Sequence, residues 1–484
     1  MNNNSRFFFI LLSVAAAIGI GNIWLYSYFS YKFTGLFFIP YLIALFILGF
    51  PLLILEFSIG QYFNKNIIDL FASIRKWFSG IGWLMLINAF ILMSYYSVIL
   101  SWHIIYFFVS FGLQWKNDAK SYFFNKVLQI SDGFENIIFS EPQKSLIFDG
   151  FRNFTQFSLP VFIALIITWI IIFFYIKNGF NSIKKWFLVT FLIFIVLIFL
   201  FFVYTITLEN SLSGVYSFLN PRLMNLFDLS VWINSFSLVV SSLGISFGIM
   251  HAFARKSKGF VLGNSSAIVI FELLLSIIIG FIVFSILGFL SAKQSVNLDS
   301  LVFRDFSSPF TILTQALPFF NKPTLFSLLF FAFLSIIFIF ATASLGYSVS
   351  HVLVHKFDTK RINAAIIVAG FGFLFGLLFI IKPGFYIMDI VWHFIYYNIL
   401  IAILLEVIAI GWFFDSEKIS EYINHNSLLK IGALWRFFIR YIIPLIILLL
   451  LYFQLKSDLL LNYKDYPLQY ILIFGVGIII VPLV

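Results

Sequence analysis

Long apolar stretches follow one another along almost the whole chain, and this succession limits what it can fold into. A helix rises about 1.5 Å per residue, so about 20 apolar residues are enough to cross a bilayer core. We predict twelve such spans, at 7–30, 36–62, 80–111, 157–177, 186–208, 229–254, 260–291, 324–354, 363–381, 386–414, 435–455 and 467–484. The expected fold is therefore an all-α polytopic membrane protein, with one transmembrane domain over 1–484.

The composition excludes several other classes of protein. Hydrophobic residues make up 62% and charged residues 10% of the chain, which is more apolar surface than a soluble domain can bury. The net charge of +10 is better explained by loops facing anionic lipids than by nucleic-acid binding. The chain has no cysteine, no phosphate-binding loop with a Gly-Lys pair and no zinc-protease motif. We therefore predict neither an enzyme nor an ATP-driven pump.

Basic residues indicate how the spans are oriented. They cluster in the short links after alternate spans, at Lys65, Arg75, Lys76, Lys177, Lys184, Lys185, Arg255, Lys256, Lys258, Lys356, Lys360 and Arg361. The positive-inside rule places these links and both termini in the cytoplasm, and the longer segments 112–156 and 292–323 outside. The 69 phenylalanines are typical of AT-rich codons, so we expect the inner membrane of a bacterium.

Two spans contain residues that do not suit contact with lipid. The first carries Gly19, Gly21 and Asn22 near its centre, and the sixth contains Ser-Ser-Leu-Gly-Ile-Ser-Phe-Gly at 241–248. Such residues favour a locally unwound helix that binds ions or substrate at the membrane midplane, although close packing of small residues is an alternative. Interruptions in spans one and six predict two inverted five-helix repeats, 7–208 and 229–414, followed by two helices at 435–484.

Several motifs, in a consistent order, resemble the bacterial branch of the neurotransmitter:sodium symporter family, which has the leucine-transporter fold. The matching stretches are GIGNIW at 19–24, IPY at 39–41, PLLILEF at 51–57, GIGW at 80–83, SYYSV at 94–98 and LLEVIAIGW at 404–412. The resemblance extends from about residue 5 to 455 and implies a transporter of the same fold.

The resemblance also implies positions for substrate and sodium. A first sodium would be bound by Ala17, Asn22, Ser242 and Glu272. The substrate would contact Ala17, Ile20, Gly21, Leu92, Tyr96, Ser241, Ser242, Gly244, Phe247 and Val349. A second sodium would use Ala15, Ile18, Ala341 and Ser344, but Leu345 replaces a hydroxyl ligand, and only Thr342 is near enough to compensate. Oxygen ligands of this kind suit a hard cation.

Two further departures from the family pattern change the expected chemistry. The anion site of some relatives falls on Tyr41, Ser242 and Ser276, but Leu238 replaces an expected glutamine. We therefore expect Glu272 to supply the negative charge, without a requirement for chloride; its alternative role is a protonated carboxyl bonded to a neighbouring helix. Leu25 and Trp392 stand where relatives carry the two charged residues of the outer gate, and we expect them to form an apolar closure together with Tyr26.

Further polar residues lie inside apolar spans. We expect Glu56, Glu406 and Asp389 to be structural hydrogen-bond anchors, His251 and His355 to lie near the cytoplasmic ends of their spans, and His103 and His393 to be interfacial. The favoured function is sodium-coupled import of a neutral, hydrophobic amino acid by a monomer or homodimer in the lipid bilayer. The alternatives are proton coupling through Glu272, or a degenerate amino-acid sensor or accessory subunit that does not transport.

Overall fold

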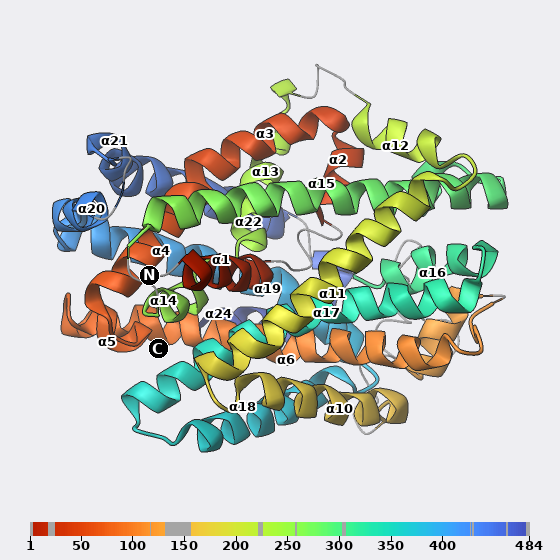
Figure 1. Ribbon diagram of the computed structural model, residues 1–484, viewed down its shortest axis with the longest axis horizontal. Coiled ribbons are helices and arrows are strands. Elements are labelled where there is room, and N and C mark those ends of the chain that lie inside the picture. The colour runs from red at the N-terminus through yellow and green to blue at the C-terminus, as the bar shows by residue number, and fades with distance from the viewer. Residues whose placement is uncertain are drawn as a thin grey trace.

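A computed structural model describes residues 3–17, 25–116, 118–130, 156–220, 226–256, 259–302, 306–425, 427, 430–460 and 463–480. Regular structure in these ranges is helical, apart from one isolated β-bridge between Phe157 and Ile381. Figure 1 shows the long helices running roughly side by side along the longest axis of the molecule. The all-α prediction is confirmed.

Nine helical segments in the described part of the chain are long and apolar enough to cross a membrane. The first consists of α3 (Phe38–Ala44) and α4 (Phe50–Phe63), joined by a π-helical turn at Leu45–Gly49. The other eight contain α6 (Ser79–Val109), α10 (Leu159–Ile176), α11 (Phe180–Ile206), α15 (Val261–Gln294), α17 (Pro323–Lys356), α18 (Arg361–Gly376), α19 (Gly384–Ile408) and α22 (Ile443–Leu460). Each falls on a predicted span.

The remaining three predicted spans correspond to shorter helices. They are α1 (Asn3–Ala17) with α2 (Tyr26–Lys32), α13 (Leu229–Ser242) with α14 (Ile249–Ala254), and α23 (Leu468–Tyr470) with α24 (Gly477–Ile480). Together with the nine long segments they account for the twelve predicted spans. The division into inverted repeats at 7–208 and 229–414 remains a prediction.

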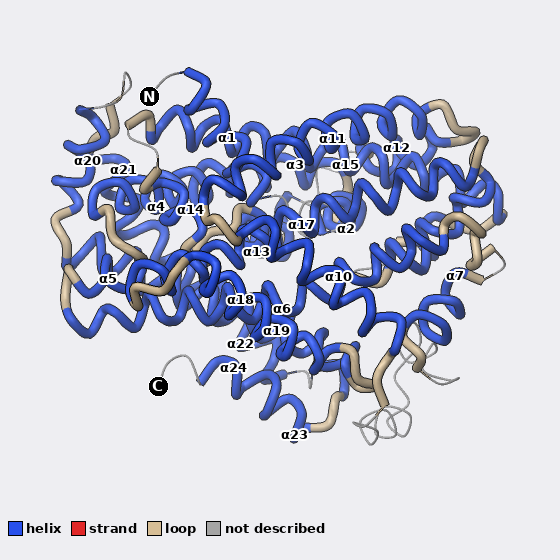
Figure 2. Tube along the Cα trace, turned by 60° about the horizontal axis from the view of Figure 1, so that its bottom comes forward, coloured by secondary structure: helices blue, strands red, loops and turns tan. Residues whose placement is uncertain are grey.

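The links between spans gather at two opposite ends of the molecule. Figures 1 and 2 show α5 (Ile67–Ala72) and α20 (Ser416–His425) at one end, and Figure 2 shows α7 (Ala119–Ser121) at the other. The short α16 (Thr314–Ala316), which lies between Pro309 and Pro318, is at the right-hand end in Figure 1, as α7 is in Figure 2.

The predicted basic links converge on the α5 end. Lys356 Nζ lies 2.7 Å from Asp69 Oδ1 of α5, and Arg255 Nε donates to Asn64 Oδ1 at 3.2 Å. Burial raises the pKa of Asp69, but hydrogen bonds from Lys356 and Asn66 outweigh this effect, so the pKa lies below its usual value. The basic segments around 64–69, 255 and 356 are thus neighbours on one face, as the positive-inside rule requires.

A close helix crossing at the opposite end depends on two glycines. In Figure 1, α12 (Ser211–Leu219) lies along α15, and a Cβ on Gly214 would be 1.9 Å from the backbone oxygen of Phe284 and 2.8 Å from the nitrogen of Gly288. Backbone atoms cannot turn aside as a flexible side chain can. The absence of a side chain on Gly214 is therefore what allows α12 to approach α15.

We expect Gly214→Ala to destabilise the protein by about 1–3 kcal/mol or more, because α12 would have to move off α15. The measurement is the melting temperature of the detergent-purified protein. Gly370→Ala in α18 is the control, because a Cβ at that position meets nothing within 4 Å. Equal melting temperatures for the two variants would contradict this interpretation of the crossing.

Candidate functional site

The sixth span is interrupted where its sequence predicts. Helix α13 ends at Ser242 and α14 begins at Ile249, and the intervening residues are not helical. Three of these residues have positive φ: Gly244 (64°), Ser246 (68°) and Gly248 (70°). Glycine adopts this conformation without steric cost, so the glycines of the 241–248 motif explain where the helix is broken.

Neighbouring helices satisfy part of the exposed backbone of the break. The Ser246 N–H donates to Glu56 Oε1 of α4 at 2.5 Å, and Ser348 Oγ of α17 donates to the carbonyl oxygen of Phe247 at 2.7 Å. Irregular backbone at membrane depth is stable only when protein or a polar cavity covers it. Helices α4 and α17 provide this cover.

The break lies against the end of α1. A Cβ on Gly244 would be 3.4 Å from the carbonyl oxygen of Ala16 and 3.9 Å from Cα of Ala17. The two predicted interruptions are thus neighbours as far as the described residues extend. Residues 18–24 lie outside the described ranges, so the break in span one stays a prediction, as do the assigned roles of Ile18, Ile20, Gly21 and Asn22.

A buried polar cluster lies beside the break, on α3, α13 and α15. The Tyr41 hydroxyl donates a short hydrogen bond to Glu272 Oε1 and lies 3.5 Å from Ser242 Oγ. Ser276 Oγ donates to the same Glu272 oxygen at 3.4 Å. All four side chains are at most 1% exposed. The structure therefore brings together Tyr41, Ser242, Glu272 and Ser276. The resemblance to the family had placed these four residues around one ion site.

The described residues of the predicted second sodium site lie on two adjacent helices. Ala15 is in α1 and Ala341 and Ser344 are in α17, and α1 contacts α17. Ser344 Oγ donates to the carbonyl of Phe340, whereas the buried Thr342 hydroxyl has no hydrogen-bond partner. Leu345 is 2% exposed and contributes no oxygen. The side-chain hydroxyl without a partner is therefore that of Thr342.

Four of the residues assigned to the substrate come from α6, from the break in the sixth span and from α17. Leu92 and Tyr96 are on α6, Phe247 is in the break and Val349 is on α17; all four are buried. The Tyr96 ring packs edge-on against Phe338 of α17, with the ring centroids 5.7 Å apart. Helices α6 and α17 pack along each other. A common cup formed by these residues, with Ser241 and Gly244 at the break, remains a prediction.

Two of the three residues of the predicted outer gate, Tyr26 and Trp392, pack against other aromatic rings. The Tyr26 ring packs on those of Tyr41 (5.1 Å between centroids) and Phe218 (6.2 Å). Trp392 stacks on Tyr95 at 6.0 Å, and Leu25 is 9% exposed. Tyr26 thus covers the Glu272 cluster through Tyr41. Direct closure between Leu25 and Trp392 stays a prediction.

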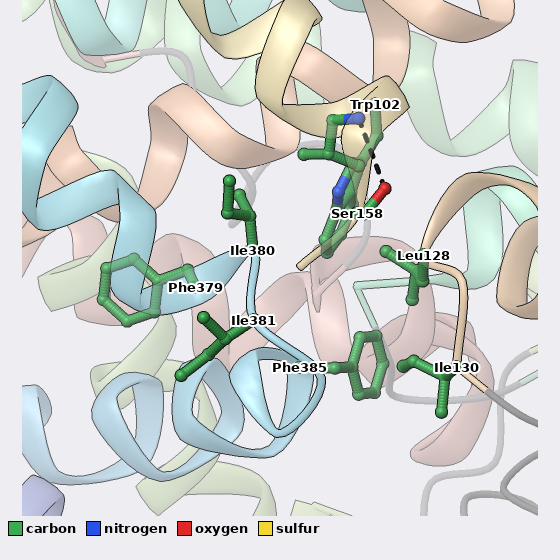
Figure 3. A pocket seen from close by; sticks show the side chains of 9 residues that line it. Trp102, Leu128, Ile130, Ser158, Phe379, Ile380, Ile381 and Phe385 are labelled. Carbon is green, nitrogen blue, oxygen red and sulfur yellow. Dashed lines mark hydrogen bonds between the residues drawn. The ribbon is translucent and has the colours of Figure 1, made fainter. Parts of the chain in front are cut away.

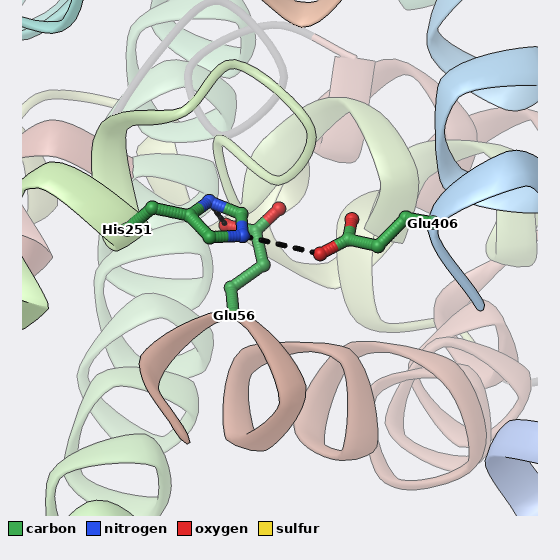
Figure 4. Close-up of side chains that lie close together, drawn as sticks. All are labelled: Glu56, His251 and Glu406. Atoms are coloured by element: carbon green, nitrogen blue, oxygen red, sulfur yellow. Dashed lines mark hydrogen bonds and ion pairs between the residues drawn. The ribbon is translucent and has the colours of Figure 1, made fainter. Parts of the chain in front are cut away.

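A second polar cluster was not anticipated from the sequence. Figure 4 shows the His251 ring of α14 close to the carboxylates of both Glu56 (α4) and Glu406 (α19). Nε2 lies 3.2 Å from Glu406 Oε1, and Nδ1 lies 3.7 Å from Glu56 Oε2. The three titratable residues in apolar spans were a visible signal, but nothing in the sequence indicated that they meet.

The structure contradicts the prediction for His103 and agrees with the one for Asp389. The expectation that His103 is interfacial was wrong: it is 1% exposed, and its Nδ1 lies 2.8 Å from the carbonyl oxygen of Ile99, one turn earlier in α6. Asp389 fits the anchor role, since it is bonded by Lys464 and Tyr466.

The cavities in the described part of the chain differ in character. One, shown in Figure 3, lies between Trp102, Ser158 and Phe385 and has a volume of about 10 Å³, enough for a single water. Another, of about 150 Å³, lies at the α5 end between α11, α17 and the end of α14, and is lined by Lys256, His351, His355 and Arg361. The first is too small for an amino acid.

A polytopic helical protein with an interrupted span and buried oxygen ligands beside it has the architecture of a secondary transporter. Comparison with known proteins gives the family. Residues 2–484 match the model of the sodium:neurotransmitter symporter family. The chain belongs to this family, which consists of sodium-coupled symporters with the leucine-transporter fold of about twelve helices.

The relatives span several kinds of organism and substrate. An uncharacterised sodium-dependent transporter of Methanocaldococcus jannaschii is 31% identical, over 99% of this chain and 95% of the relative. The rat sodium- and chloride-dependent GABA transporter 2 is 27% identical, over 89% and 76%. A sodium-dependent nutrient amino acid transporter of Drosophila grimshawi is 26% identical, over 94% and 77%. Sodium dependence is common to these names, whereas the substrate, the chloride requirement and the predicted bacterial membrane are not decided by them.

Proposed function

We propose that this protein imports a neutral, hydrophobic amino acid together with sodium by alternating access. The observation that carries the proposal is the buried cluster of Tyr41, Ser242, Glu272 and Ser276 beside the broken sixth span. It offers a carboxylate and hydroxyl oxygens to a hard cation. Asn22 and the carbonyl of Ala17 would complete the sodium site, and the substrate carboxylate would face Ile20, Gly21 and Tyr96.

Ion binding would drive transport through differential affinity. Sodium held between the ends of α1 and α13 favours the conformation in which these segments are close together, and substrate then permits closure of the outer side. The apolar side chains of Leu92, Phe247 and Val349 favour aliphatic or aromatic substrates over charged ones. Glu272 supplies the local negative charge, so chloride is not required.

The test begins with the melting temperature of the purified protein in each of the twenty amino acids, in sodium chloride and in choline chloride. Amino acids that stabilise only in sodium are then assayed for uptake into proteoliposomes at several pH values. Uptake that needs sodium supports the proposal. If a proton gradient drives uptake in choline chloride, the transporter is coupled to protons instead of sodium. If an amino acid binds but does not accumulate, the protein is a sensor and not a transporter.

The second sodium site is tested by Thr342→Val, which replaces a buried hydroxyl with a methyl group. If Thr342 compensates for Leu345, we expect the sodium concentration for half-maximal uptake to rise about tenfold, or about 1.4 kcal/mol. If no ion is bound there, removing a buried hydroxyl without a hydrogen-bond partner leaves uptake unchanged and stability equal or higher. Ser344→Ala is the parallel variant, since its hydroxyl already bonds within α17.

A further inference from the structure

The Glu56, His251 and Glu406 cluster is buried inside the protein. The exposed fractions of the three residues are 0%, 1% and 0%. Glu56 Oε2, Glu406 Oε2 and His251 Nδ1 have no hydrogen-bond partner, although Nδ1 is within ion-pair distance of Glu56. Buried polar atoms are costly unless they are paired. The cluster therefore has the composition of a binding site rather than of a fully satisfied structural network.

The two ring nitrogens of His251 face different carboxylates, as Figure 4 shows. A neutral imidazole carries one N–H and one lone pair, and a lone pair facing an ionised carboxylate is repulsive. Both contacts are attractive only if a proton lies in each of them. Two contacts need two protons, and the neutral imidazole supplies one. The other proton has to be bound from water.

We propose that Glu56, His251 and Glu406 form a buried proton-binding site that holds α14 against α4 and α19. The bound proton changes the net charge of the three groups from −2 to −1, and it returns to water when α14 moves away and the groups become hydrated. One ligand atom from each of the three residues lies within 4.8 Å of the others, so a metal ion is the competing occupant of this cluster, and the experiment below separates it from a proton.

The site is linked to the broken span through Glu56. While Oε2 of Glu56 faces His251, its Oε1 accepts the N–H of Ser246 inside the break. The same carboxylate thus contacts the break and the half-helix that follows it. Proton binding stabilises the arrangement in which α14 is docked, so acidic conditions favour the docked state and alkaline conditions favour its release.

One other titratable pair is close to α14 and has to be separated from this site. Arg255, which follows α14, lies 2.7 Å from Nε2 of His351 on α17. The Phe71 ring of α5 covers His251 with a centroid distance of 6.4 Å and carries no charge. His355 lies beside His351, with the ring centroids 4.5 Å apart. A pH effect on α14 could therefore arise at His251, at His351 or at His355, and a variant of each distinguishes them.

The test uses the full chain in lipid nanodiscs, without substrate or sodium and with a chelator. Because the chain has no cysteine, Lys256→Cys at the exposed position two residues after the end of α14 accepts a single nitroxide label. Electron paramagnetic resonance then gives the ratio of immobile to mobile label from about pH 5.5 to about pH 9.5, the range around the titration of histidine. If one proton is released, the ratio of immobile to mobile label falls by up to about tenfold for each unit by which the pH rises.

We expect His251→Gln and Glu406→Gln to abolish the transition, and His351→Gln, His355→Gln and His103→Gln to retain it. His103 is the matched control, since it is equally buried but bonds only to a backbone carbonyl. Infrared spectroscopy of the unsubstituted protein should show loss of a protonated carboxyl or imidazolium band over the same pH interval, which needs no variant. A transition that persists in His251→Gln, vanishes in His351→Gln, or appears only with added Zn²⁺ would overturn the proposal.

Discussion

Glu272→Gln is expected to lower sodium-dependent uptake by at least about a hundredfold, equivalent to about 3 kcal/mol. Glutamine keeps the shape of the side chain but removes the charge that would balance a sodium ion in a site 1% exposed. Its amide would also present donors or a weaker acceptor to Tyr41 and Ser276, both of which now donate to Glu272 Oε1. The measurement is initial uptake into proteoliposomes at several sodium concentrations.

Glu209→Gln is the matched control for this variant. Glu209 pairs with Lys293 at the surface, where its side chain is 73% exposed, so its removal should leave uptake unchanged. Uptake by the unsubstituted protein is expected to be the same in chloride and in gluconate. A Glu272→Gln protein with normal sodium dependence, or an unsubstituted protein that needs chloride, would show that Glu272 does not supply the charge.

Gly248→Ala is expected to cost about 1–2 kcal/mol in stability and to abolish most uptake. Gly248 has φ of 70°, a conformation in which a Cβ meets the backbone. The new Cβ would also lie 2.9 Å from Ser348 Oγ, whose hydrogen bond covers the exposed carbonyl of Phe247. The substitution therefore disturbs the break at its junction with α14. Melting temperature and uptake rate are measured together.

The comparison variant is Gly80→Ala at the start of α6, where a Cβ meets nothing within 4 Å. The uptake rate of this variant should be unchanged, and its stability should be equal or higher by up to about 1 kcal/mol, because alanine favours the helix. Adding Ser348→Ala to Gly248→Ala should recover little stability, since the φ strain remains. Full activity of Gly248→Ala would mean that the left-handed turn is not required for the site.

Much of the fold follows from local properties of the chain. Span length and hydropathy do not depend on neighbours, so the nine long helices fall on their predicted ranges. The break in span six was equally local, because Gly244 and Gly248 make positive φ easy. The Glu272 cluster needed more information: Tyr41 and Glu272 are 231 residues apart, and only motif resemblance placed them at one site.

The sequence by itself determined the class of protein, its spans and the position of the interrupted sixth helix, because bilayer insertion and backbone freedom are properties of short segments. Only the tertiary structure decided that His251 contacts both Glu56 and Glu406, and that His103 is buried with its Nδ1 against the carbonyl oxygen of Ile99. His251 and Glu406 are separated by 155 residues. Their meeting depends on how α4, α14 and α19 pack, and no local pattern encodes that packing.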